Sequence, residues 1–406
     1  MDIEGITELP LHDGHVPPYL LRRMKFLGSL IARHIIETYG PEELLRRLAN
    51  PYWFQAFNNV IGMDWDSSGS TTVVLYVLKE ALPPDRIDEN EIAVLGGKGR
   101  DAVNTALEIA RLRIDLDKGE LVRLSRVAAK IDSVALQDGY ILYIHGLLVT
   151  SYGKTLVIQQ GMNIREKLAR RYHIYVENGI RNLLSEDPHS GVISSRISTA
   201  LNLVDDQSRE TRKAIVDILN STPLDSLLQD LRNVNRLLKG LGDITLYHHG
   251  YSGVSGTETN KVVFVDKISG KINANKFFYR PITDMKRVEL VARKLKETLV
   301  QDFKDLLLRE GLGPETMRAI ALVADLIYGY EPSFTDPTTH LVDPFLYAYA
   351  HGGKDGIPYK VRIRELDKTI EFFTNLINCI RVGNKEREYM LRNLSKIVLK
   401  FKYFLK

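Results

Sequence analysis

Residues 139–160, GYILYIHGLLVTSYGKTLVIQQ, decide the fold class of this 406-residue chain. Two runs rich in β-branched and aromatic residues, Gly139–Ser151 and Lys154–Gln160, flank Tyr152-Gly153, and this arrangement predicts a β-hairpin with a glycine turn. Helical patterns lie on both sides of the hairpin. We therefore expect the α+β class, with a mixed α/β domain over residues 1–200 and a mostly helical domain over residues 201–406.

Outward from the hairpin, apolar residues recur every three or four positions from Pro18 to Tyr39, which predicts a helix that ends at Gly40-Pro41. In the N-terminal half we expect further helices at 41–48, 72–81, from Gly99 to Arg113 and over the arginine-rich stretch 164–178, with a buried strand at 92–95. In the C-terminal half we expect helices at 206–241 and 284–310, a second hairpin at 261–278, and an almost wholly helical remainder.

Composition narrows the class of protein. Cys379 is the only cysteine, which excludes an intrachain disulfide and a cysteine-based zinc site. The N-terminus lacks the pattern of a secretory signal, and no apolar run approaches the roughly 18 residues of a membrane span, so we expect a cytoplasmic protein without a membrane partner. The net charge is +4, and residues 377–406 alone carry eight Lys and Arg against Glu386 and Glu388. This basic end is equally typical of a nucleic-acid contact and of an oligomer contact, such as a homodimer.

The most specific motif is LLLREGLGPETMRAIALVADLIYG at residues 306–329, which matches a helix-hairpin-helix. Gly311 and Gly313 allow a close backbone turn, and the free N–H groups near Thr316, at the start of the second helix, suit a DNA phosphate. Such a contact positions a duplex without reading its sequence. The alternative is an ordinary pair of helices joined by a glycine turn.

This hairpin resembles that of the endonuclease III type DNA glycosylases, in which an acidic residue of the lesion pocket follows the second helix. Asp336 is the better match here, and Asp343 is the alternative. Lyase members of that group carry a lysine directly before the hairpin threonine, where this chain has Glu315, so the resemblance implies a monofunctional enzyme. The alternative interpretation of Asp336 is structural, because an aspartate that precedes a proline commonly forms a turn.

A polar cluster lies in the first domain, over residues 129–163. Amides with a tyrosine suit either a pocket for a flipped base or a structural network; these residues are Gln137, Tyr143, Gln159, Gln160 and Asn163. Carboxylates with a lysine suit a divalent-metal nuclease, although their spacing is not diagnostic; these residues are Asp132, Asp138 and Lys130.

Basic residues offer further contacts for phosphate. Arg170 and Arg171 fall on the predicted helix at 164–178, where a solvated helix face is the alternative. Lys354 lies in a glycine-rich loop at 349–358 and could contact a phosphate. The alternative interpretation of this segment is an ordinary solvated loop.

Long strings of the chain together resemble one family, the archaeal and thermophile domain-of-unknown-function family seven-six-three. The strings include NPYWFQAFNNVIGMDWDSSGSTT, AKIDSVALQDGYILYIHG, VIQQGMN and GPETMRAIALVADLIYG, and the resemblance runs from Leu9 to Pro358. It implies no settled activity. Family members typically carry histidine where this chain has Asp66 and Ile144, which argues against a histidine metal centre, so no resident metal is expected.

Three functions follow from these motifs. The first is a DNA repair enzyme that excises a damaged base, with Asp336, Asp138 and Lys130 as catalytic candidates. The second is a DNA nuclease, which alone requires a divalent metal as cofactor. The third is a non-catalytic DNA-binding protein. All three predict DNA as the partner and salt-dependent binding.

Overall fold

The computed structural model of the protein describes residues 16, 18–62, 68–177, 179–241, 245–248, 262–265, 278–341, 363–380 and 382–402. Asp343 and Lys354, two of the candidate residues, lie outside these ranges, as does most of the predicted second hairpin.

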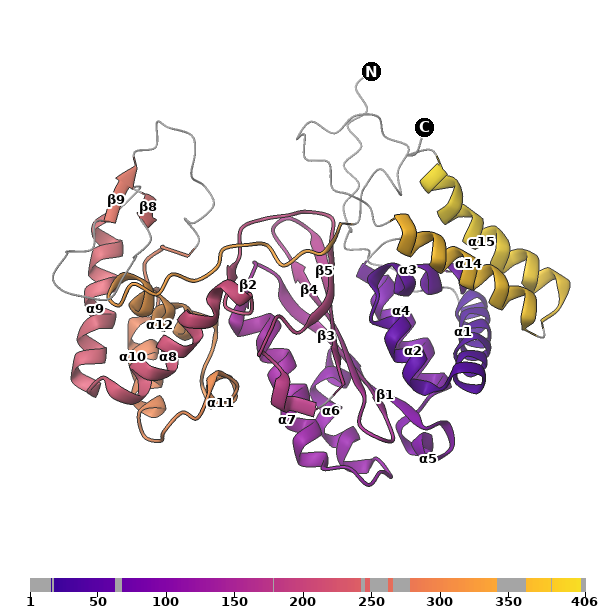
Figure 1. Cartoon of the computed structure of the whole chain (residues 1–406), viewed down its shortest axis with the longest axis horizontal. Helices are drawn as coiled ribbons and strands as arrows, with labels where there is room; N and C mark the ends of the chain where they lie inside the picture. Colours follow the sequence, from indigo (N-terminus) through magenta and orange to yellow (C-terminus); the bar gives the residue numbers. More distant parts are fainter. Residues whose placement is uncertain are drawn as a thin grey trace, which may run out of the picture.

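A six-stranded sheet runs through the middle of the molecule (Figure 1). Neighbouring strands are antiparallel in the order β1-β3-β4-β5-β6, and β10 pairs in parallel with β6 at one edge. The strands are β1 (Ile92–Lys98), β3 (Ile141–Thr150), β4 (Thr155–Asn163), β5 (Leu168–Val176), β6 (His189–Ser194) and β10 (His340–Leu341). Together with the helices around it, this sheet confirms the predicted α+β class.

The hairpin of β3 and β4 forms where the sequence predicts it. Thr155 pairs with Val149, and the turn closes when the Gly153 amide donates to the Thr150 carbonyl at 3.1 Å. Gly153 has φ +97°, a conformation that glycine adopts without the steric cost borne by other residues.

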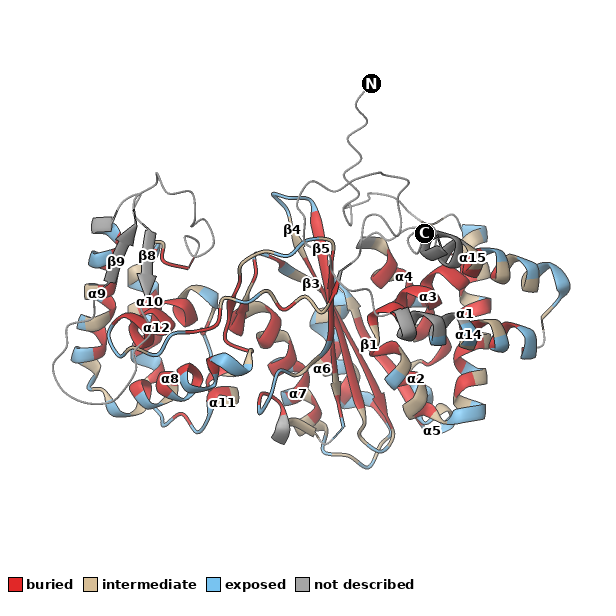
Figure 2. Ribbon diagram, turned by 45° about the horizontal axis from the view of Figure 1, so that its top comes forward, coloured by how far each residue is buried: buried red, intermediate tan, exposed pale blue. Residues whose placement is uncertain are grey.

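One face of the sheet is covered by helices from both ends of the chain, which share one hydrophobic core with it (Figure 2). Trp53 stacks on Phe57 within its own helix and on Phe373, with ring centroids 5.7 and 4.9 Å apart. The C-terminal helices, which the sequence analysis grouped with the second domain, therefore pack against the N-terminal ones. The helices are α1 (Pro18–Tyr39), α2 (Pro41–Leu48), α3 (Pro51–Val60), α4 (Ser68–Ala81), α14 (Ile363–Cys379) and α15 (Asn384–Lys402). The short helix α5 (Ile87–Asn90) instead contributes Ile87 to the second core.

The other face is covered by α6 (Arg100–Arg111) and α7 (Lys118–Lys130), beyond which a helical region continues the second core. In that region α12 (Pro314–Leu326) lies at the centre, and each of its residues from Thr316 to Leu326 is buried. Its other helices are α8 (Arg209–Ser221), α9 (Leu224–Leu241), α10 (Met285–Leu295) and α11 (Phe303–Leu307). Two small antiparallel pairs complete the fold: β2 (Leu136–Gln137) with β7 (Leu201–Asn202), and β8 (Thr245–His248) with β9 (Val262–Val265).

Three sequence predictions need correction. The predicted helix at 164–178 is wrong: its central part is β5, a strand between β4 and β6. The predicted helix at 206–241 is two helices separated at Thr222-Pro223, because proline lacks the amide that the helix needs. The predicted helix at 284–310 is likewise interrupted between α10 and α11, where Asp302 begins the second helix by accepting from the Asp305 amide at 2.8 Å.

Across the described ranges, the structure contains no helix that combines the length and the apolar character needed to cross a membrane.

Candidate functional site

The polar side chains of β3, β4 and β5 fall on two opposite faces of the sheet, because successive residues of a strand point to opposite sides. Gln159 lies beside His145 and Tyr172 in the strand register, whereas Gln160 lies beside Arg171. The two glutamines predicted to share a base pocket therefore face different hydrophobic cores.

On the face toward α3 and α4, Gln160 bonds to Thr71 and to the Tyr143 hydroxyl. The Arg171 guanidinium lies 4.1 Å from the centre of the Phe54 ring and donates from Nε to a histidine of the same strand. Tyr143 and Gln160 thus meet in a network that also contains Thr71 and the buried Arg171.

Arg170 joins two of the candidate carboxylates on the other face. Its guanidinium donates to Asp138 Oδ2 at 2.9 Å and to Asp336 Oδ2 at 2.8 Å, and all three side chains are almost inaccessible to solvent. Tyr172 donates to the same Asp138 oxygen at 2.7 Å, and the Ser198 amide donates to Asp336 at 2.7 Å. These bonds fasten β5 to the segment that carries Asp336.

The predicted contacts of Arg170 and Arg171 with DNA are not compatible with this arrangement. The prediction relied on an exposed helix, but a central strand buries both side chains. A guanidinium without surface exposure cannot reach a phosphate of the duplex backbone.

A charged chain of three side chains runs from the core to the surface. His189 donates from Nε2 to Asp132 Oδ1 at 2.7 Å and from Nδ1 to Asp187 Oδ1 at 2.6 Å. Burial alone lowers the pKa of His189, but the charges of Asp132 and Asp187 outweigh burial and raise that pKa to about 10. Burial also raises the pKa of Asp132. Because only an imidazolium donates from both nitrogens, the ionised arrangement fits the geometry better.

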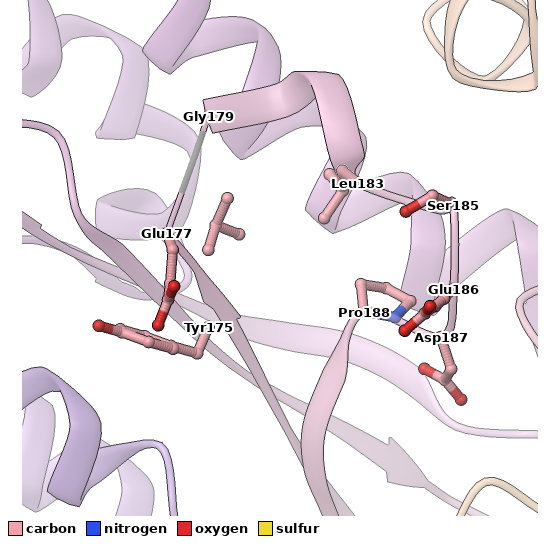
Figure 3. A pocket seen from close by; sticks show the side chains of 9 residues that line it. Tyr175, Glu177, Gly179, Leu183, Ser185, Glu186, Asp187 and Pro188 are labelled. Atoms are coloured by element: carbon pink, nitrogen blue, oxygen red, sulfur yellow. The ribbon is translucent and has the colours of Figure 1, made fainter.

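The outer end of this chain opens into a hollow of about 240 Å³. Figure 3 shows the hollow between the end of β5, with Tyr175 and Glu177, and the loop that carries Glu186 and Asp187. Its lining is rich in carboxylates. Among the described residues, however, no group of three or more His, Cys, Asp or Glu side chains is arranged to hold a metal ion.

A second hydrogen-bonded chain meets the first at Asp132. Ser125 Oγ on α7 lies 2.8 Å from His145 Nε2, and His145 Nδ1 lies 2.9 Å from Gln159 Oε1. Gln159 Nε2 donates to the Ala128 carbonyl at 3.0 Å and also to Asp132. Burial lowers the pKa of His145. Ser125 is not among the candidates predicted from sequence, because a serine within an amphipathic helix gives no signal of its own.

The turn between α11 and α12 remains at the surface. Gly311 is exposed and has φ +81°, and Gly313 is half-buried with an extended backbone at φ −123°. Gly313 is the N-cap residue of α12 and has no side chain that could cap the helix. Thr316, which the sequence analysis placed at the DNA contact, has a buried side chain, so only its backbone amide is relevant to such a contact.

Two candidate residues of the first domain support this turn instead of forming a pocket. Lys130 donates to the Leu312 carbonyl at 2.7 Å, and Gln137 donates to the Pro314 carbonyl at 2.8 Å. Burial lowers the pKa of Lys130. Asn163 lies elsewhere, at the end of β4, where it accepts from the Arg165 amide at 3.1 Å.

Helix α7 leads from this turn to an exposed basic face that the sequence analysis did not identify. Arg123 and Arg126 are exposed, and within the described part of the chain neither forms a salt bridge. At 1.5 Å per residue they lie about 10 and about 6 Å along the helix from Lys130. Both line a hollow of about 810 Å³ between α6 and α7. The sequence signal that could have revealed this basic face is the three- and four-residue spacing of Arg123, Arg126 and Lys130, which places them on one side of a helix.

Fold and site together define an α+β protein with buried polar networks in its sheet and an exposed turn between α11 and α12. The chain matches the family described as "Protein of unknown function (DUF763)" over residues 5–361, and it therefore belongs to that family. No curated protein and no solved structure matched the chain.

Proposed function

We propose that this protein binds duplex DNA through its backbone phosphates, at the turn between α11 and α12, without reading base sequence. The observation that carries the proposal is the exposed Gly311–Gly313 turn, followed by a helix whose N-cap residue, Gly313, has no side chain to bond its first amides. Backbone N–H groups at a helix start, reinforced by the helix dipole, suit a phosphate oxygen.

The shape of the turn supports the proposal. A Cβ atom built on Gly313 meets no other atom within 4 Å, so the space in front of this residue is open. The carbonyls of Leu312 and Pro314 are held from behind by Lys130 and Gln137. The turn is thereby fixed in position, which lowers the entropy cost of binding.

The basic face of α7 supplies the second element. Because Lys130 joins the end of α7 to the turn, Arg123 and Arg126 extend a line of positive charge away from it. A phosphate held at the turn would leave neighbouring phosphates of the same duplex within reach of these side chains.

Binding of a labelled duplex, measured by fluorescence anisotropy at several salt concentrations, tests the proposal. We expect affinity to fall linearly with salt on logarithmic axes, and the double variant Arg123→Ala/Arg126→Ala to reduce the slope by about 2, since each phosphate contact contributes about 0.9. The matched control is Arg22→Ala/Arg33→Ala, which removes two exposed arginines from α1 on the opposite side of the sheet. An equal loss of slope in the control, or no binding by the native protein, would contradict the proposal.

Base excision and metal-dependent cleavage are not part of this proposal. The carboxylates of Asp336 and Asp138 are occupied by Arg170 and by neighbouring donors, and Lys130 is bonded to the turn. A general base has to lie within hydrogen-bond reach of its substrate. Base release from lesion-containing duplexes, compared between the native protein and Asp336→Asn, tests the repair hypothesis directly.

A further inference from the structure

Beyond DNA binding, we infer that the groove between α6 and α7 is a docking site for a partner protein, which inserts an acidic amphipathic helix into it. The groove is the hollow of about 810 Å³ that Arg123 and Arg126 line, and α6 and α7 lie side by side along it (Figure 1). Ligand pockets of proteins have volumes of about 300–1,000 Å³. The groove is therefore large enough to receive several side chains of a partner.

An exposed apolar crest runs along α6 at the rim of this groove. Val103 and Leu107 are 82% and 61% exposed, and Ala110, one turn after Leu107, lines the groove itself. Their spacing places the three side chains on one side of α6, away from the buried Thr105 and Ile109. Apolar side chains at this spacing are those that a second helix contacts when it packs lengthwise on the first.

The groove beside the crest also has apolar side chains. Val122 of α7 and Ile180 line it, and both are partly exposed. A helix seated between α6 and α7 therefore contacts apolar groups on both sides. The crest from Val103 to Ala110 is about 10 Å long, at 1.5 Å per residue, so two to three turns of a partner helix cover it.

Charge selects an acidic partner. Three of the charged side chains that line the groove are bonded within the protein: Asp117 accepts from a backbone amide of α7 at 2.8 Å, Lys118 donates to a carbonyl of α6 at 3.2 Å, and Glu120 accepts from a backbone amide at 3.4 Å. Arg123 and Arg126 are exposed, and within the described residues neither is paired with a carboxylate. Their guanidinium groups complement glutamate and aspartate side chains that flank the apolar stripe of a partner helix.

Other occupants match only one part of this surface. A second copy of the chain, packed symmetrically, would bring Arg123 and Arg126 close to their own counterparts, and these like charges repel. A nucleic acid would neutralise the arginines but leave Val103 and Leu107 in water, because its phosphate backbone offers them no apolar contact. A bilayer would cover the crest but would not fill a hollow. An acidic amphipathic helix matches both the crest and the arginines.

The test is fluorescence anisotropy with the full-length protein and a labelled, hydrocarbon-stapled peptide of about 16 residues, with leucine at helical spacing and glutamate on both sides of the leucines. We expect binding of this peptide and no binding of a peptide with lysine in place of each glutamate. Val103→Ser/Leu107→Ser should weaken binding about tenfold through lost apolar burial. Arg123→Ala/Arg126→Ala should weaken it about fivefold at low salt.

The matched control is Leu290→Ser/Leu299→Ser, which removes two leucines that are 56% and 72% exposed and do not line the groove. This variant should bind the peptide as the native protein does. Absence of binding by the native protein, or equal affinities of the native protein and Val103→Ser/Leu107→Ser, would overturn the proposal. So would a dimer in sedimentation velocity, or binding to phosphatidylserine vesicles, that Val103→Ser/Leu107→Ser abolishes, because the groove would then serve a second copy or a membrane.

Competition with a labelled duplex separates this proposal from the proposed DNA binding. Because both partners use Arg123 and Arg126, the peptide should displace the duplex, a consequence that rests on the function proposed above. Val103→Ser/Leu107→Ser should lose peptide affinity and keep duplex affinity, since the duplex contacts only α7 and the turn. A native protein that binds the peptide but no duplex would contradict DNA binding alone, and one that binds a duplex but not the peptide would contradict docking alone.

Discussion

The centre of the sheet and the turn between α11 and α12, called the hairpin below, both present polar groups, but they use these groups in opposite ways. In the sheet, Arg170, Asp138 and Asp336 bind one another and are withdrawn from solvent. At the hairpin, Gly311 and Gly313 leave the backbone at the surface. The difference teaches that polar side chains gathered in a sheet often bond to one another and are closed to a ligand. A turn of two glycines, which has few polar side chains, can leave its backbone more accessible to a ligand.

The comparison predicts that changes in the sheet act on stability and that changes in the hairpin act on binding. The largest effect is expected for Arg170→Met, which leaves two buried carboxylates without a cation. Breaking a buried ion pair from one side costs about 3–5 kcal/mol. Urea unfolding followed by circular dichroism measures this loss.

The control for this prediction is Arg196→Met. Arg196 pairs with Glu166 at 3.2 Å, but their side chains are 60% and 39% exposed. Exposed pairs contribute about 1 kcal/mol or less, so this variant should unfold close to the native midpoint. Equal losses in the two variants would remove the distinction between the buried and the exposed pair.

A smaller effect is expected from pH, through His189. Its pKa is about 10 in the folded protein, above the ordinary value of 6.5. A raised pKa stabilises the folded state fully below the unfolded value, and this contribution is lost as pH rises through the folded value. We therefore expect the free energy of unfolding to fall by about 2–4 kcal/mol between pH 6.5 and pH 10, at about 1.4 kcal/mol per pKa unit.

The variant His189→Asn isolates this contribution, since it keeps a polar side chain but does not titrate. Its stability should be lower at pH 6.5 and nearly independent of pH over the same window. If the native protein and the variant lose stability in parallel between pH 6.5 and pH 10, the charge on His189 does not hold Asp132 and Asp187 together.

Local sequence patterns predict the elements that depend on neighbours in the chain. The β3–β4 hairpin follows from two β-rich runs and Gly153, and the helix at Pro18–Tyr39 follows from its apolar spacing. The opposite orientations of Gln159 and Gln160 also follow from the two-residue period of a strand, once the strand is recognised.

Local sequence patterns fail to predict an element where its structure depends on contacts with residues that are distant in the sequence. Arg170 sits in a buried strand because it is neutralised by Asp138 and Asp336, which lie 32 and 166 residues away. An arginine-rich stretch therefore resembles a solvated helix until these partners are known. The packing of α14 and α15 on the N-terminal helices is equally long-range, and so is the contact of Lys130 with the hairpin.

The two glycines of the hairpin provide the smallest and most discriminating test. Gly311 has φ +81°, so Gly311→Ala should cost about 1–2 kcal/mol of stability. Gly313 has an extended backbone and faces open space, so Gly313→Ala should change the free energy of unfolding by less than about 1 kcal/mol. The added methyl group would nevertheless occupy the position that a phosphate has to approach. We expect an affinity loss of about tenfold, or about 1.4 kcal/mol, that is equal for unrelated duplex sequences, because a phosphate contact carries no base information. Thermal melting and anisotropy on the same samples separate the two effects, and a Gly313→Ala protein that binds every duplex like the native one would show that the turn is not the contact.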